Sequence, residues 1–97
     1  MHAVIGIFKM DPAFYDQQLQ GLQQMIIPMV KSQPGFRHGY WNYDRPGAKS
    51  YSYIILESEE AARKFAGMVK ENNSRPNPFG VALESLTIVE LLAEARP

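Results

Sequence analysis

The chain has 97 residues, with ten Lys plus Arg, ten Asp plus Glu and no cysteine, so its formal net charge is zero. This length is that of a single domain, residues 1–97, and neither sign of charge forms a run that would attract nucleic acid or a membrane surface. The lack of cysteine excludes disulfides, thiolate metal sites and a cysteine nucleophile.

The first third of the chain predicts a strand followed by a long helix. Residues 3–8, AVIGIF, are apolar on both faces of any strand they form. Asp11 and Pro12 are typical of a helix start, because Asp caps a free N–H and proline needs none at the first helical position. We expect a kink near Pro28 and an end at residues 33–35. The side of this helix that should be buried carries Tyr15, Leu19, Leu22, Ile26 and Met29.

The rest of the chain predicts a hairpin, a second helix and a last strand. Ser58 is expected to cap the helix, and Glu59 and Glu60 follow where acids face the positive end of the helix dipole. The expected segments are a strand at residues 36–43, a turn at 44–47, a strand at 50–57, a loop at 72–78 and a strand at 81–92.

The predicted order β-α-β-β-α-β is that of the α+β, ferredoxin-like split fold, in which a four-stranded antiparallel sheet carries both helices on one face. Two helices cover one side of such a sheet, yet the first strand is apolar on both sides. Val4 and Phe8 lie on one side, and Ile5 and Ile7 lie on the other. A bare apolar face is unfavourable in water. We therefore expect a homodimer in which the uncovered sheet faces of two copies pack together.

The N-terminal residues, MHAVIGIFKM, contain an apolar stretch with no basic segment before it and no small-residue cleavage site after it. We expect this segment to be a strand of the mature protein and the protein to be cytoplasmic. No window approaches the roughly 20 apolar residues that a membrane helix requires, so no membrane partner is predicted.

Three short motifs, in this order, resemble the dimeric α/β-barrel superfamily in its antibiotic-biosynthesis-monooxygenase-like branch. They are Pro34-Gly35-Phe36 after the first helix, Gly39-Tyr40-Trp41 in the next strand, and the acidic, alanine-rich helix start at residues 58–65. The resemblance spans nearly the whole chain in element order and implies the same face-to-face dimer. It leaves the reaction open, because the superfamily includes cofactor-independent oxygenases of aromatic polyketides, haem-degrading enzymes, isomerases and proteins without an assigned activity.

The haem-degrading members of that superfamily carry an asparagine on the first strand and a histidine on the second helix. Here the first strand has an apolar run from Val4 to Phe8 without asparagine, and Phe65 and its neighbours stand where the histidine would be. Haem degradation by that route is therefore not expected. No cofactor is predicted, since no glycine-rich phosphate loop occurs, although use of a diffusible reduced flavin stays open. Two histidines without acidic residues at ligand spacing predict no metal site.

The stretch HGYWNYD, residues 38–44, holds the best candidates for chemistry. His38 is the candidate catalytic residue, because an imidazole exchanges protons near neutral pH. The alternative is a hydrogen-bonded structural histidine. Side chains alternate along a strand, so the aromatic residues must be divided between two faces. We expect one face to carry Phe36, His38, Tyr40 and Asn42, and the other to carry Arg37, Gly39, Trp41 and Tyr43.

The expected substrate-binding residues are Tyr40, Trp41, Tyr51, Tyr53 and Arg75. The hairpin register, which the sequence does not state, decides whether Tyr51 and Tyr53 join His38 or Trp41. A wall of phenol and imidazole groups would suit an aromatic or quinol-like ligand, and Arg75 would bind a carboxylate or phenolate. The alternative for each aromatic residue is burial in the core or the dimer interface, and for Arg75 a solvated loop.

These features favour a small-molecule-binding homodimer, and specifically a cofactor-independent monooxygenase that acts on an aromatic or quinol-like substrate. The opposing hypothesis is a non-catalytic dimeric ligand-binding or stress-response protein, because no constellation of residues compels a reaction. An isomerase or lyase that uses the same pocket without oxygen is a third hypothesis.

Overall fold

A computed structural model describes all 97 residues of the chain. The elements follow the order expected from the sequence, with the first helix divided into short segments. The strands are β1 (His2–Met10), β2 (Phe36–Asp44), β3 (Lys49–Leu56) and β4 (Val81–Glu90). The first helix consists of a 3₁₀ turn η1 (Pro12–Phe14), α1 (Tyr15–Gly21), a π-helical turn η2 (Leu22–Ile26) and α2 (Ile27–Lys31), and the second helix is α3 (Glu59–Asn72).

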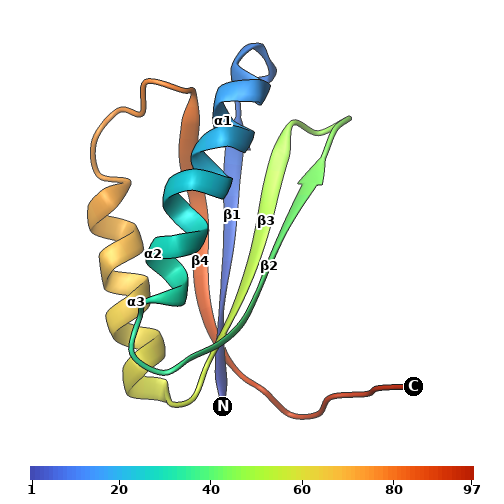
Figure 1. Ribbon diagram of the computed structural model, residues 1–97, viewed down its shortest axis with the longest axis vertical. Coiled ribbons are helices and arrows are strands. Elements are labelled where there is room, and N and C mark those ends of the chain that lie inside the picture. Colours follow the sequence, from blue (N-terminus) through green and yellow to red (C-terminus); the bar gives the residue numbers. More distant parts are fainter.

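The four strands form one antiparallel sheet in the order β2-β3-β1-β4. In Figure 1 the helices lie on one side of this sheet, with α3 beside β4 and with α1 and α2 in front of the middle strands. The ferredoxin-like arrangement expected from the sequence is therefore confirmed. We call the side with helices the helix face and the other side the open face.

Both helix starts are capped as the sequence predicts. The Asp11 carboxylate accepts a hydrogen bond from the backbone N–H of Ala13 at 3.0 Å, and the Ser58 hydroxyl accepts one from that of Ala61 at 3.1 Å. Each bond satisfies a donor that has no partner within the helix. The caps thus fix the residues at which the two helices begin.

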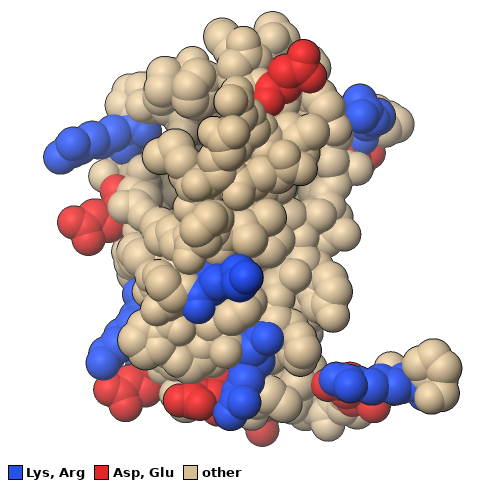
Figure 2. All heavy atoms as spheres, viewed as in Figure 1, with Lys and Arg blue, Asp and Glu red and all other residues tan.

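The hydrophobic core lies between the helix face of the sheet and the helices. Charged side chains lie mostly toward the edges of this side of the molecule (Figure 2). No helix combines the length and the apolar composition needed to cross a bilayer. The buried core residues are Val4, Ile54 and Leu56 from the strands and Val30, Ala62, Phe65 and Ala66 from the helices.

The first helix buries less apolar surface than its sequence predicts. Its buried residues are Gln18 and Val30. Leu19 and Ile26, both expected on the inner side, are 39% and 41% exposed. The prediction of one continuous buried stripe is therefore wrong.

The π-helical turn η2 explains the exposure of Ile26 but not that of Leu19, which lies before the turn. The N–H of Ile27 bonds to the carbonyl of Leu22, five residues back, so the chain takes one extra residue to complete this turn. The extra residue rotates all later side chains relative to an α-helical stripe. Pro28 follows directly and cannot donate to the carbonyl four residues before it, which is why the disturbance lies near this position.

A bulge at Arg37 changes the faces of β2. Phe36 pairs with Leu56 and His38 pairs with Ile55, so Arg37 has no partner of its own on β3. Phe36 therefore packs against the core on the helix face. The expectation from strict alternation, that Phe36 and His38 share a face, is wrong. From His38 to the end of the strand the predicted alternation holds.

The last strand ends at Glu90, two residues before the predicted end at Leu92. The bond from the Leu91 N–H to the Met1 carbonyl, at 2.9 Å, is the last bond between this part of the chain and β1. Residues 91–97, which we call the C-terminal tail, turn away from β4 toward the β2 side of the sheet (Figure 1).

We expect Leu56→Ala to lower the free energy of unfolding by about 2–5 kcal/mol, because the side chain is fully buried and its truncation leaves a cavity. Met25→Ala is the control: this side chain is 71% exposed, and its removal should change stability by less than about 0.5 kcal/mol. Urea unfolding followed by circular dichroism, at one protein concentration, measures both. Equal losses in the two variants would contradict the assigned core.

Candidate functional site

The register of the sheet gathers His38, Tyr40 and Tyr53 on the open face. Between β2 and β3, Tyr40 lies directly opposite Tyr53, and His38 lies opposite Ile55. Residues paired in this way point to the same side of a sheet. The hairpin therefore places Tyr53 on the side of His38 and away from Trp41.

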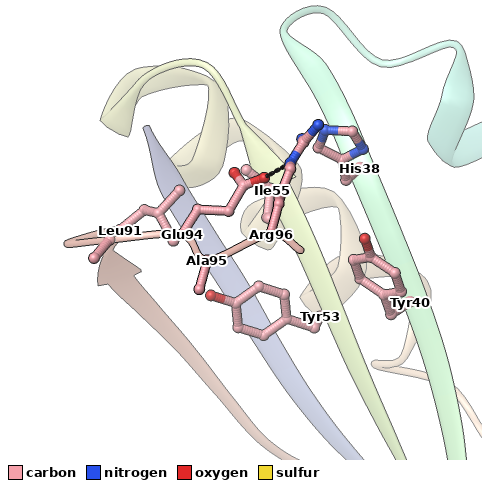
Figure 3. A pocket seen from close by; sticks show the side chains of 9 residues that line it. His38, Tyr40, Tyr53, Ile55, Leu91, Glu94, Ala95 and Arg96 are labelled. Carbon is pink, nitrogen blue, oxygen red and sulfur yellow. Dashed lines mark hydrogen bonds and ion pairs between the residues drawn. The ribbon is translucent and has the colours of Figure 1, made fainter.

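A cavity of about 340 Å³ lies between these tyrosines and the C-terminal tail. In Figure 3, Tyr40 and Tyr53 stand on adjacent strands, and Arg96 of the tail and His38 both line the cavity. Ile55 is only 8% exposed, although no helix covers the open face, because the tail passes over it. The volume is at the lower end of the range for small-molecule sites. The tail lines the cavity with Leu91, Ala93, Glu94, Ala95 and Arg96.

The polar groups of the cavity have few partners within the chain. The Nε–H of Arg96 donates to the carboxylate of Glu94, and the other guanidinium nitrogens bond to no protein group. The imidazole of His38 and the hydroxyls of Tyr40 and Tyr53 make no hydrogen bond within the chain. These groups are therefore available to a ligand.

Two surface ion pairs perturb ionisable groups, and both lie outside the cavity. A hydrogen bond to Glu84 raises the pKa of Lys49, and a hydrogen bond from Arg63 lowers the pKa of Glu59. All four side chains are at least partly exposed, where such pairs contribute little to stability. The charged side chains at the cavity itself belong to the tail.

The remaining residues expected to bind substrate lie away from the cavity. Tyr51 is on the open face, two residues along β3 from Tyr53, and is 38% exposed. Trp41 is on the helix face, where it packs against the core. Arg75 is exposed in the loop between α3 and β4, and this loop leads to the end of β4 that is opposite the tail (Figure 1).

Aromatic side chains on the helix face hold the β2–β3 hairpin against the first helix. The ring centroids of Tyr15 and Tyr43 are 5.4 Å apart, and the guanidinium carbon of Arg45 lies 4.7 Å from the Tyr15 centroid. Arg45 also donates a hydrogen bond to the Tyr15 hydroxyl at 3.2 Å. Trp41 lies over Gly39, where an added Cβ would come within 2.9 Å of the indole. These contacts occupy the aromatic side chains of β2 that lie on the helix face. The cavity on the open face is therefore the candidate site.

The sequence carries no signal for the contribution of the tail. Glu94 and Arg96 are two residues apart after an apolar strand, a pattern that is common on solvated surfaces. They line the cavity only because the tail crosses the open face (Figure 3). The grouping of His38, Tyr40 and Tyr53, in contrast, follows from alternation once the hairpin register is known.

No protein-family model and no curated protein sequence matches this chain, whereas solved structures are similar to it. MhuD, a haem-degrader from Mycobacterium tuberculosis, has a TM-score of 0.74 and 16% identity, with 99% of this chain and 100% of that chain covered. The ActVA-Orf6 monooxygenase of Streptomyces coelicolor, solved with nanaomycin D, has a TM-score of 0.68 and 18% identity, with 99% of this chain and 91% of that chain covered. Rv0793 of M. tuberculosis has a TM-score of 0.64 and 21% identity, over 98% of each chain. At these identities the likeness is one of fold.

The buried side of α3 offers no ligand to a haem iron. Haem iron takes an axial ligand such as histidine. The buried side chains of α3 are Ala62, Phe65 and Ala66, which offer no such ligand, and His38 lies on the open face. No three potential metal ligands among His, Asp and Glu lie together anywhere in the chain.

We expect Tyr53→Ala to weaken the binding of 2-naphthamide, an uncharged aromatic probe, by about three- to tenfold, because an aromatic contact contributes about 0.5–1.5 kcal/mol. Tyr43→Ala removes the same kind of side chain from the helix face and should change the affinity by less than about twofold. Isothermal titration calorimetry measures both variants. A loss of equal size in Tyr43→Ala would place the ligand elsewhere.

Proposed function

We propose that this chain is a homodimer that binds a small aromatic molecule and oxidises it with O₂. The premise is that the chain has the antibiotic-biosynthesis-monooxygenase-like fold of the dimeric α/β barrels. The observation that carries this proposal is the register of β2 with β3, which puts His38, Tyr40 and Tyr53 around one cavity. Two phenol rings suit a planar ligand, and the imidazole supplies an acid–base group beside it. The fold likeness to a monooxygenase supports the class of reaction as an analogy only.

The second copy is proposed to cover the open face. Ile5 and Ile7 on β1 and Tyr51 on β3 stand on this face with no helix over them. An apolar and aromatic centre without charge is typical of a homodimer interface, and the Lys49–Glu84 ion pair lies at one end of the face rather than in its centre. Each Å² of apolar surface covered would contribute roughly 25 cal/mol before the costs of association. The cavity would then lie at the subunit interface, and the partner would close its open side.

We expect Ile7→Lys to convert the dimer to a monomer, because a lysine in the centre of the interface would be buried without a partner. Met25→Lys is the matched control, since Met25 is 71% exposed on the first helix and its replacement should leave the dimer intact. Sedimentation velocity at micromolar concentration measures the assembly of both variants and of the natural chain. A natural chain that sediments as a monomer would contradict the proposed interface.

His38 is proposed to start the reaction by taking a proton from the bound substrate. With an anthrone, loss of a proton from the ring CH₂ to the imidazole leaves an enolate, which passes electrons to O₂. One oxygen atom becomes the new carbonyl and the other leaves as water, so the overall change is CH₂ + O₂ → C=O + H₂O. The substrate supplies all the electrons. The hydroxyls of Tyr40 and Tyr53 are placed to donate hydrogen bonds to the anion that forms.

Oxygen consumption with a panel of hydroquinones and anthrones tests this reaction. We expect uptake above the buffer rate, and a loss of about 10²- to 10⁴-fold in His38→Ala, which is the usual contribution of a general acid–base group. His2→Ala removes the other histidine, which lies at the start of β1, and should retain the activity. Unchanged turnover in His38→Ala would show that the imidazole is not the base.

The rival function is a non-catalytic dimer that binds a metabolite. One observation favours it: no carboxylate or carbonyl of the chain orients the imidazole of His38, whereas a catalytic base is usually held by a third group. Binding of panel compounds without any oxygen uptake would support this function over the monooxygenase.

A further inference from the structure

The C-terminal tail adds charge to an otherwise uncharged aromatic wall. Among the residues that line the cavity, Arg96 carries the one permanent positive charge and Glu94 the one negative charge. The two side chains are joined through the Nε–H of Arg96. Figure 3 shows Arg96 among the side chains that line the cavity together with His38 and the two tyrosines.

The unpaired charged groups in this cavity are hydrogen-bond donors. The guanidinium has further N–H groups on its terminal nitrogens, and none of them has a partner in the chain. The phenol hydroxyls of Tyr40 and Tyr53 donate as well. The one carboxylate of the cavity, on Glu94, is already bound to Arg96. A ligand that offers acceptor oxygens therefore matches this cavity better than a ligand that offers donors.

We propose that the cavity is selective for aromatic anions, with the rings of Tyr40 and Tyr53 against the ligand plane and Arg96 bound to its carboxylate or phenolate. This inference deepens the proposed small-molecule function and rests on it. A planar guanidinium suits the role because it binds a carboxylate through two parallel hydrogen bonds. Glu94 competes with the ligand for the same guanidinium, so it opposes anion binding.

The attachment of the tail allows Arg96 to follow a ligand. Its last backbone bond to the sheet is the one from Leu91 to Met1, and Leu92 is 90% exposed. Arg96 can therefore move toward a bound anion without breaking a strand. Arg75, the arginine that the sequence marks for an anion, belongs to the loop between α3 and β4, does not line the cavity and serves as the control.

The pair 2-naphthoate and 2-naphthamide tests the inference, because the two ligands share their rings and differ in charge. Calorimetry on the full chain should show tighter binding of the naphthoate. We expect Arg96→Gln to weaken naphthoate binding by about tenfold, the loss of a charge-assisted hydrogen bond, and to leave naphthamide binding unchanged. Glu94→Gln should act in the opposite direction and tighten naphthoate binding by about two- to fivefold. Arg75→Gln should alter neither affinity.

The outcomes separate this inference from the function it rests on. If Arg96→Gln weakens both ligands equally, or neither, then Arg96 does not bind the anion and the inference is overturned, while the small-molecule site stands. If neither ligand binds the natural chain, the site and the inference both fail. Partial recovery of naphthoate binding in Arg96→Lys, which keeps the charge but not the planar fork, would support the inference.

Discussion

The helices of this chain cover only one of the two faces of its sheet, and most other features follow from that constraint. The covered face holds a continuous core around Leu56 and Phe65. The open face carries Ile5, Ile7 and a group of tyrosines, which are too apolar to be stable as a bare surface. Two groups are available to cover them: the C-terminal tail, which already lies over one end of the face, and a second copy of the chain. The candidate site lies on this face, beneath the tail.

A single extra residue on β2 decides which aromatic side chains lie on that face. Because the bulge at Arg37 absorbs one residue, Phe36 turns into the core while His38 begins a regular run of pairs with β3. Without the bulge, Phe36 and His38 would lie on the same face, so either Phe36 would leave the core or the residues from His38 onward would exchange faces. The same register pairs Tyr40 with Tyr53 and places Trp41 on the helix face. The composition of the cavity is thus a consequence of backbone pairing rather than of any local motif.

The fold is shared with proteins whose chemistry differs, so function has to be argued from side chains. On the helix face, α3 offers apolar residues where a haem would need a ligand, and Trp41 and the Tyr15–Tyr43–Arg45 group pack against their neighbours. On the open face, the phenols, the imidazole of His38 and the guanidinium of Arg96 have unused hydrogen-bonding capacity. Unused polar groups around a cavity mark a binding site more clearly than packed ones do, because a ligand satisfies them.

Local patterns in the sequence determined the helices and strands of this protein, because a cap, a turn or an alternation of apolar residues depends on only a few neighbouring residues. The caps at Asp11 and Ser58 lie where the sequence predicts them, the apolar strands and the turn after β2 lie within about two residues of their predicted bounds, and their order led to the ferredoxin-like fold. The division of the aromatics from His38 onward also followed from alternation alone. Only the tertiary structure decided the rest. The π turn before Pro28 shifted the buried side of the first helix, the hairpin register joined Tyr53 to His38, and the tail carried Arg96 across the sheet. The hairpin register and the path of the tail depend on contacts between segments far apart in the chain, which no local spacing of residues encodes. The π turn is local and lies beside Pro28, but how far it turns the helix stripe was seen only in the structure.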